Sequence, residues 1–338
     1  MNENETTKLE QETLAYQSLD PDQILSAIET QGYITDGRLL ALNSYENRVY
    51  RVGLEEAPAI VVKFYRPFRW TNEAILEEHQ FAQELADAEI PVIPPLQNDQ
   101  GETLHTVGFF RFAVFENHGG RPPELDNGDH LNQLGRFLGR IHNVGASRTF
   151  NNRPDHSIQD FAGDAWMYVL EHGFIPRDLE LAYRSLCEDL MQRIKWCFER
   201  CGDTTMIRLH GDCHPGNILW TPDGPHIVDL DDTRTGPAMQ DLWMFLSGDR
   251  VERTWALSEL LDGYKEFRDF PANELHLIEA LRTMRMIYYH GWLAKRWKDP
   301  AFPHSFPWFN TQRNWEQHIL DLREQASMMD EEPLHLFG

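Results

Sequence analysis

The sequence reads HGDCHPGN at residues 210–217 and IVDLDD at residues 227–232. The residues between these stretches are predicted to form two short strands, 218–221 and 226–230, joined by the turn PDG at 222–224. A chain that reverses in this way brings the two ends of the hairpin together. The polar side chains of the two quoted stretches are therefore expected to lie close in space, although they are well separated in sequence.

Three of these side chains suit the transfer of a phosphoryl group. Such a reaction needs an acid that orients and deprotonates the attacking hydroxyl, oxygen ligands for Mg²⁺, and a cation for the phosphates. Mg²⁺ takes one or two oxygen ligands from a protein and the rest from phosphate and water. Asp212, Asn217 and Asp229 supply the acid and the oxygen ligands of this set. The pattern indicates an ATP- and Mg²⁺-dependent phosphotransferase.

The rest of the chain divides into a sheet-rich first half and a helical second half, so the predicted fold class is α+β. We expect an acidic tail over 1–19, a small domain over 20–117 and a helical domain over 118–338 that carries the hairpin. Expected strands are 38–42, 48–52, 59–65, 92–97 and 109–115. Expected helices are a short one from Pro21, with Asp20 as its N-cap and Gly32 as its stop, one that carries the apolar stripe at 131–141, and 72–88, 238–247, 253–267, 272–298 and 311–328.

The charge, the apolar runs and the cysteines of the sequence limit which binding partners and which cellular location are expected. The 338 residues include 31 Lys and Arg against 54 Asp and Glu, for a formal net charge of −23, which disfavours nucleic acid as a partner. The sequence shows no signal peptide and no run of the roughly 18–20 apolar residues that a membrane span needs. Its four cysteines form no disulfide or metal pattern. A cytoplasmic protein without membrane contact is expected.

The motif HGDxxxxN, followed by an apolar strand and Asp229, resembles the signature of the aminoglycoside phosphotransferase, choline kinase and homoserine kinase-like group, whose members are relatives of protein kinases. The resemblance implies a bilobal protein-kinase-like fold with a small α/β N-lobe and a mainly helical C-lobe. Further segments resemble the bacterial stress response kinases of this group, from about residue 20 to the C-terminus: 42–50, 62–67, 75–81, 119–121, 209–219, 236–237, 240–243, 296–297 and 299–303. This implies a monomeric, cytoplasmic serine/threonine protein kinase linked to stress, with ATP and protein substrates, itself included, as partners.

The resemblance also implies roles for single residues. Asp212 would be the catalytic base, and Asn217 and Asp229 would hold Mg²⁺, with Asp229 also counted among the catalytic residues. Lys63 would reach the α- and β-phosphates of ATP, with Glu78 on the following helix as its partner.

Three further features of the nucleotide site are expected. Glu77 is the alternative lysine partner, but Glu78 is favoured because Leu85 follows two turns later on the packed face of the helix. Ser44, in the turn between the first two strands, would touch the phosphates. Backbone groups around 115–117 would bind adenine.

Departures from protein kinases keep a second function open. The phosphate-covering turn is not glycine-rich, DLD at 229–231 stands where protein kinases have Asp-Phe-Gly, and no activation segment is recognisable. The alternative is a small-molecule kinase acting on an amino alcohol or an aminoglycoside-like substrate. A nucleotide-sensing protein without turnover is a third alternative, which the complete set of acids disfavours.

Some polar residues near the motif have structural interpretations. Asp241 is expected to brace the catalytic loop. The adjacent acids Asp231 and Asp232 are expected to need a compensating cation such as Arg208 or Arg234. Cys213 lies inside the loop, and its oxidation is hypothesised to disturb Asp212.

Overall fold

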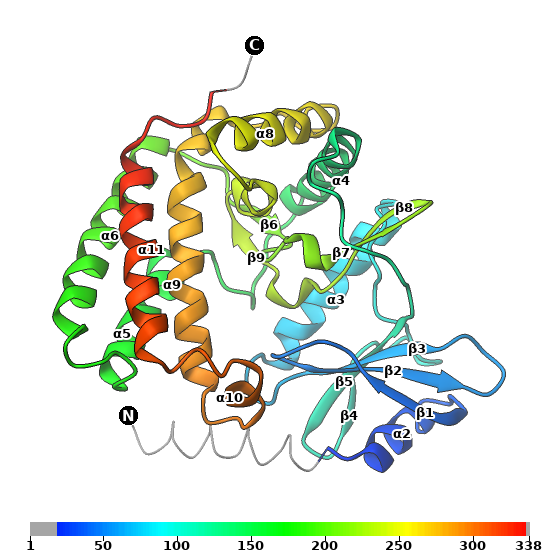
Figure 1. The fold of residues 1–338 in the computed structure, drawn as a ribbon. Helices are drawn as coiled ribbons and strands as arrows, with labels where there is room; N and C mark the ends of the chain where they lie inside the picture. Colours follow the sequence, from blue (N-terminus) through cyan, green and yellow to red (C-terminus); the bar gives the residue numbers. More distant parts are fainter. Residues whose placement is uncertain (1–18, 336–338) are drawn as a thin grey trace. The chain divides into compact units, whose positions relative to one another are not determined.

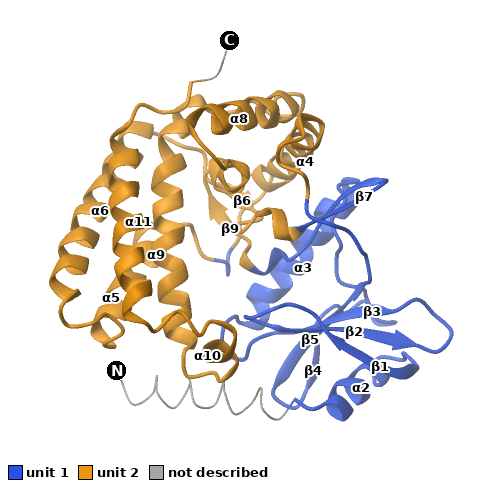
Figure 2. Ribbon diagram, viewed as in Figure 1, with its two compact units in different colours: residues 1–122, 151–153, 218–231 blue, residues 123–150, 154–217, 232–338 orange. Residues whose placement is uncertain are grey.

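The computed structural model describes residues 19–335 (Figure 1). It consists of two compact units (Figure 2). Unit 1 comprises residues up to 122 together with 151–153 and 218–231, and unit 2 comprises 123–150, 154–217 and 232 onward. The tail predicted for 1–19 lies outside the described residues except for Leu19, and the predicted domain limits stay a prediction.

Unit 1 is built on a five-stranded antiparallel sheet with the strand order β1-β2-β3-β5-β4. The central strand β3 is buried because its run of β-branched residues packs against both neighbours and the helices of the unit. The elements of the sheet and its helices are α2 (Pro21–Glu29), β1 (Thr35–Ala41), β2 (Arg48–Leu54), β3 (Ile60–Phe64), α3 (Asn72–Asp87), β4 (His105–Val107) and β5 (Phe110–Glu116).

Helix α3 begins and ends where local chemistry dictates. The Thr71 side chain accepts a hydrogen bond from the backbone N–H of Ala74, which caps the first turn. The helix stops at Asp87, and Glu89 then adopts a left-handed conformation with φ of 57°. The predicted helix over 72–88 is confirmed almost residue for residue.

The strand predicted over 92–97 is wrong. This segment contains Pro94 and Pro95, which lack the N–H groups that a continuous ladder needs, and it makes only isolated pairings through Val92 and Pro95. The fifth strand of the sheet is instead β4, which is only three residues long.

The predicted hairpin is present in unit 1 as β7 (Ile218–Thr221) and β8 (Gly224–Ile227), paired antiparallel. The second strand ends at Ile227, three residues earlier than predicted. The acids at 229, 231 and 232 therefore lie beyond the paired part of the hairpin. The linker that follows β5 pairs with this hairpin through reciprocal backbone hydrogen bonds between Arg121 and Trp220, at 3.1 and 2.7 Å. Gly120 permits this approach, since a Cβ there would lie 2.7 Å from the backbone of Leu219.

Unit 2 is helical, with one two-stranded sheet, β6 (Ile207–Leu209) with β9 (Arg234–Gly236). Helices α4 and α8 pack closely, and this is possible because Gly135 and Gly263 have no Cβ. A Cβ at either position would strike the backbone of the facing helix. The helices are α4 (Gly128–Ala146), a π-helical turn (Gln159–Gly163), α5 (Asp164–Glu171), α6 (Glu180–Cys201), α7 (Met239–Leu242), α8 (Arg250–Tyr264), α9 (Ile278–Arg296), α10 (Ala301–Ser305) and α11 (Gln312–Asp330), with short 3-10 turns at 215–217, 230–232, 243–245 and 272–277.

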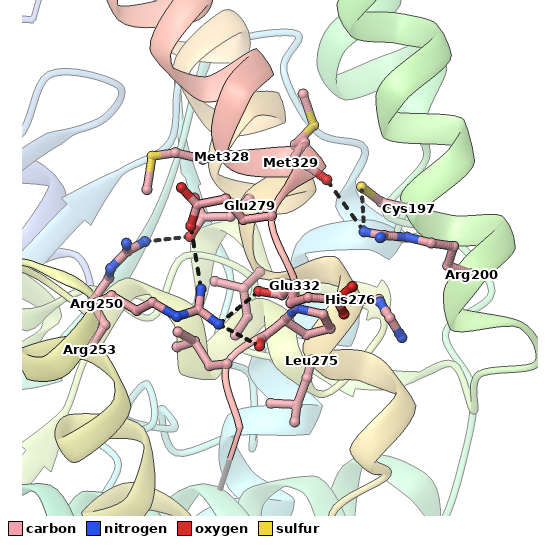
Figure 3. Close-up of a pocket in the computed structure, with 14 residues that line it drawn as sticks. Cys197, Arg200, Arg250, Arg253, Leu275, His276, Glu279, Met328, Met329 and Glu332 are labelled. Atoms are coloured by element: carbon pink, nitrogen blue, oxygen red, sulfur yellow. Dashed lines mark hydrogen bonds and ion pairs between the residues drawn. The ribbon is translucent and has the colours of Figure 1, made fainter.

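The segment after α11, residues 331–335, is hydrogen-bonded to the start of α8 (Figure 3). The Arg250 guanidinium donates to the carbonyl oxygens of Glu332 and Pro333, at 2.9 and 2.8 Å. A cavity of about 30 Å³ beside this contact has room for about one water molecule. Leu334 is buried, so the segment is part of the packed structure of unit 2.

The predicted α+β class is confirmed, because a sheet-based unit and a helical unit occur in one chain. The long helix predicted over 272–298 is divided into a 3-10 turn, 272–277, and α9. Between residues 19 and 335, no helix is both long enough and apolar enough to cross a membrane.

Candidate active site

Lys63 lies at the centre of a buried charge cluster in unit 1. It sits in β3 and is only 6% exposed. Its Nζ lies 3.3 Å from Oε1 of Glu78, 3.1 Å from Oδ1 of Asp229 and 3.1 Å from Oδ1 of Asp231. The structure therefore brings together Lys63, Glu78 and Asp229 from three segments of the chain and adds Asp231.

The charges of this cluster stabilise one another. Burial by itself would lower the pKa of Lys63, but the carboxylates of Asp231, Glu78 and Asp229 outweigh it and hold that pKa well above its ordinary value. Burial would raise the pKa of Asp231, yet Arg69, Lys63 and Arg153 lower it. The lysine is a cation and Asp231 is a carboxylate at neutral pH.

Arg153 connects the two acidic arms of the cluster. Its Nη2 lies 2.6 Å from Oε2 of Glu78, and its Nη1 donates to the carbonyl oxygen of Asp231 at 2.6 Å. Its Nε donates to the carbonyl oxygen of Ala74 in α3 at 2.8 Å. Arg69 forms a further ion pair with Asp231. The cations beside Asp231 are thus Lys63, Arg69 and Arg153, which the sequence did not indicate, and Asp232 pairs with Arg234, as predicted.

Glu78, and not Glu77, contacts Lys63. Glu77 accepts hydrogen bonds from the backbone N–H groups of residues 151, 152 and 153, at 2.8, 2.8 and 3.1 Å. These bonds hold the short segment that carries Arg153. The two neighbouring acids of α3 therefore support the same cluster in different ways.

Asp229 has an unusual backbone conformation. Its φ is 62°, in the left-handed region that non-glycine residues rarely occupy. Its side chain is 50% exposed although Oδ1 contacts the buried Lys63. Such a conformation is retained where the surrounding structure imposes it, commonly at functional sites. Asp229 therefore presents a carboxylate to solvent while it remains anchored to Lys63.

The loop after β6 carries Asp212 and Asn217 in unit 2. The side-chain amide of Asn217 donates to the carbonyl oxygen of Asp212 at 3.0 Å, so the two residues are in direct contact. Gly211 has a φ of 86°, and a Cβ at this position would strike the carbonyl oxygen of Asp232. The glycine of the motif is thus required both by its conformation and by close packing.

Asp241 braces this loop, as predicted. It is fully buried, and its carboxylate accepts from the backbone N–H of His210 at 2.8 Å and of Gly211 at 2.9 Å. It also contacts Nε2 of the buried His142 at 3.2 Å. Burial would raise the pKa of Asp241, but the hydrogen bond from His142 and the neighbouring donors lower it. A charged, satisfied carboxylate therefore fixes the backbone immediately before Asp212.

One cation beside Asp212 was missed by sequence reasoning. Arg285 of α9 places its Nη2 2.8 Å from Oδ1 of Asp212, and Nε2 of His214 lies 3.7 Å from Oδ2. His214 belongs to the motif, whereas Arg285 lies in a helix far along the chain without a local pattern that marks it. Only the tertiary structure reveals this contact.

Ser44 and Cys213 are the two other residues near the site for which the sequence suggested a role. Ser44 lies, partly buried, in the turn between β1 and β2, and its contact with phosphate stays a prediction. Cys213 is completely buried, and burial raises the pKa of its thiol well above the ordinary value. Oxidation proceeds through the thiolate, so this environment disfavours the hypothesis that Cys213 is a redox sensor.

The oxygen donors fit Mg²⁺. Asn217 uses its amide nitrogen on the loop, which leaves its amide oxygen as the atom that can bind a cation. Asp229 offers a half-exposed carboxylate. Amide and carboxylate oxygens are the ligands that Mg²⁺ prefers, whereas zinc sites use mainly nitrogen and sulfur.

Known proteins are similar to this chain in sequence along nearly its whole length. Residues 38–276 match the phosphotransferase enzyme family. Stress response kinase A of Escherichia coli (strain K12) is 44% identical over 321 residues, which cover 95% of this chain and 97% of that protein. The serine/threonine protein kinase RdoA of Salmonella typhimurium (strain LT2) is 43% identical over the same shares.

Solved structures share the kinase-like fold. The amicoumacin kinase hAmiN, in a complex with AMP-PNP, Ca²⁺ and Ami, has a TM-score of 0.69 at 20% identity and covers 90% of this chain and 92% of its own. A microcompartment-associated aminopropanol kinase also has a TM-score of 0.69, at 17% identity, covering 91% of this chain and 96% of its own. At these identities the likeness concerns the fold alone.

Proposed function

The chain belongs to the phosphotransferase enzyme family, and from that premise we propose that it is an ATP- and Mg²⁺-dependent serine/threonine protein kinase of the bacterial stress response. It would transfer the γ-phosphate of ATP to hydroxyl groups of proteins, itself included. The observation that carries the kinase proposal is the buried Lys63 held between Glu78 and Asp229. A cation fixed beside a half-exposed carboxylate is what a metal-bound triphosphate requires.

The residues of unit 1 would bind the nucleotide. Lys63 would donate to the α- and β-phosphate oxygens, and Glu78 would keep the ammonium group in place. Ser44 would contact the phosphates from the turn between β1 and β2. Backbone groups at 115–117 would hydrogen-bond adenine.

The reacting hydroxyl would be handled by Asp212. Its carboxylate would accept the hydroxyl proton, and the hydrogen bonds that the backbone N–H groups of His210 and Gly211 donate to Asp241 keep the loop in position. Asn217 and Asp229 would hold Mg²⁺. When bound, this ion neutralises charge on the phosphate oxygens.

The acceptor class separates two candidate functions. The Salmonella relative that bears the name serine/threonine protein kinase supports a protein acceptor. One structural feature favours the alternative, a kinase for an amino alcohol or an aminoglycoside-like molecule. The segment from Asp229 to the start of α7 at Met239 is short and includes β9, so it contains no counterpart of an activation segment.

Radiolabelled ATP distinguishes these candidates. The protein is incubated with Mg²⁺ and either a serine-containing protein or a panel of amino alcohols, and the labelled product is identified. We expect label in the protein acceptor. Transfer to small molecules alone would contradict the protein-kinase proposal, and transfer to neither would contradict the kinase proposal itself.

Asp212→Asn tests the base in the same assay. We expect kcat to fall by about 10³-fold or more while ATP affinity stays within a few-fold, because the variant loses a contact made in the transition state. Asp249→Asn is a matched control, since Asp249 caps α8 and asparagine caps equally well. The cytoplasmic location and the monomeric state stay predictions.

A further inference from the structure

Arg285 forms an ion pair with Asp212, the proposed base, but does not donate a hydrogen bond to it. The ion pair of its Nη2 with Oδ1 of Asp212 measures 2.8 Å, and both residues belong to unit 2. Within residues 19–335, this buried oxygen accepts no aligned hydrogen bond, so the contact is one of charge. Because Oδ1 is covered whereas the Asp212 side chain as a whole is 18% exposed, an acceptor hydroxyl would meet the other oxygen, Oδ2, beside the guanidinium.

Two other carboxylates of unit 2 beside the loop, Asp241 and Asp232, are committed elsewhere. Asp241 is fully buried and uses its oxygens on His142 and the loop backbone. Asp232 pairs with Arg234 at 2.9 Å. The side of unit 2 that carries the base thus presents a guanidinium, 30% exposed, where a kinase for cationic acceptors would need a free acid.

We propose that Arg285 is a specificity-determining residue that selects acceptors with an anionic group beside the hydroxyl and rejects those with an ammonium group there. This inference rests on the proposed function. An acceptor hydroxyl must approach Asp212 to within about 3 Å. An ammonium group two carbons from that hydroxyl would compete with Arg285 for the carboxylate and would be repelled by it.

The favoured acceptor is a serine or threonine with acidic neighbours. A carboxylate next to the hydroxyl can bind the planar guanidinium through two hydrogen bonds, which adds geometric selection to charge. The net charge of −23 opposes the approach of acidic peptides. That long-range repulsion is screened beyond about 8 Å at physiological salt, so the contact with Arg285 dominates the bound state.

Three serine peptides that differ only in flanking Glu, Gln or Lys residues test the proposal. For the wild type we expect the highest kcat/KM with the Glu peptide and the lowest with the Lys peptide. Arg285→Gln should lower the Glu-to-Lys ratio of kcat/KM by roughly tenfold, and Arg285→Glu should lower it further. Arg285→Lys, which keeps the charge, should retain the preference.

Arg282→Gln is the matched control, because Arg282 lies one turn earlier on α9 and pairs with Glu279 at 3.2 Å. It should leave the ratio unchanged. If Arg285→Gln lowers kcat/KM equally for all three peptides, Arg285 only positions Asp212, and the proposal is wrong. A wild type that does not prefer the Glu peptide overturns the proposal without any variant.

The outcome can be separated from failure of the proposed function. If the protein phosphorylates no peptide, the same variants are assayed with glycerate, a hydroxy acid, and ethanolamine, an amino alcohol. A wild-type preference for glycerate that Arg285→Gln removes would support the role of Arg285 even though the protein-kinase proposal had failed. A preference for ethanolamine would overturn both.

Discussion

Lys63 shows how a buried cation can be kept ready for phosphate. An isolated ammonium group in the core would be strongly destabilising. Glu78, Asp229 and Asp231 each lie within 3.3 Å of its Nζ. Glu78 and Asp231 are themselves buried and are held by Arg153, so this arrangement is built into the fold of unit 1 before any nucleotide binds.

Glu78→Gln should weaken this arrangement. The variant removes one negative charge from Lys63 and Arg153 while keeping the size of the side chain. We expect the free energy of unfolding to fall by about 2–4 kcal/mol and kcat/KM for ATP to fall by about 10–100-fold. Urea unfolding and steady-state kinetics measure the two effects.

Glu77→Gln is the matched control, because Glu77 contacts the backbone of 151–153 and not Lys63. It should change kcat/KM for ATP less than Glu78→Gln does. Equal losses in the two variants would show that segment 151–153, which Glu77 holds, matters to nucleotide binding as much as the contact between Glu78 and Lys63.

The sequence predicts one half of this cluster and misses the other. Glu78 could be chosen over Glu77 because the helical period of α3 places it on the packed face with Leu85. Arg153 lies in a short segment between elements, with no periodicity to show that it is buried. Arg285 is missed for a different reason: it lies on a helix, where an arginine is usually a solvent-exposed residue without a specific partner. Their roles depend on tertiary contacts alone.

At the scale of elements, regular periodicity decides what the sequence reveals. Helix α3 is predicted almost exactly as found because its buried residues recur with the helical period. Strand β7 has only one buried residue, and the turn that follows it is what marks its end in the sequence. Strands β6 and β9 have three residues each, too few for a period to be recognised. Strand β6 nevertheless leads directly into the loop that carries Asp212, and its pairing with β9 fixes the start of that loop.

Glu274 joins the 3-10 turn 272–277 to the short helix α7, which carries Asp241. It is completely buried, and its carboxylate accepts from the backbone N–H of Met239 at 2.8 Å. Burial raises the pKa of Glu274 to about 7, from 4.5 for an unperturbed group. Since the folded pKa is the higher one, this group favours folding most below pH 4.5, and the contribution is lost as pH rises through about 7.

Glu274→Gln should remove this pH dependence. Glutamine keeps an oxygen acceptor for Met239 but cannot ionise. We expect the free energy of unfolding of the wild type, relative to the variant, to fall by about 3 kcal/mol between pH 4.5 and pH 8. Urea unfolding across this range measures the difference.

Glu266→Gln, at an exposed ion pair with Arg136, should show a difference within about 0.5 kcal/mol throughout. A flat difference for Glu274→Gln would mean that Glu274 ionises normally in the folded protein.

At the scale of the whole molecule, the residues proposed to act together come from both compact units. Asp212 and Asn217 belong to unit 2, whereas Lys63, Glu78 and Asp229 belong to unit 1. The hairpin β7–β8 belongs to unit 1, although it follows Asn217 directly in the chain. The motif reveals the acids because their spacing reflects their chemistry. It cannot reveal how the chain is divided, which depends on contacts between residues far apart in sequence.

Removal of Mg²⁺ tests this joint action. A ligand that binds only the folded protein raises the free energy of unfolding, by about 2.7 kcal/mol at a concentration 100 times its Kd. For a chain of this size, such a gain raises Tm by a few degrees. We therefore expect AMP-PNP with Mg²⁺ to raise Tm in thermal unfolding and EDTA to remove most of the rise. Asp229→Asn should lose the Mg²⁺-dependent part, because it removes a charged oxygen ligand.

Asp223→Asn isolates the effect of Asp229, since Asp223 is an exposed acid in the turn of the same hairpin. It should retain the full Mg²⁺-dependent rise. Asp212→Asn should retain it as well, because Asp212 is proposed to meet the acceptor hydroxyl and not the metal. If Asp229→Asn kept the wild-type rise while Asp212→Asn lost it, the proposed division of labour between the two acids would be reversed. The left-handed backbone at Asp229 would then need an explanation other than metal binding.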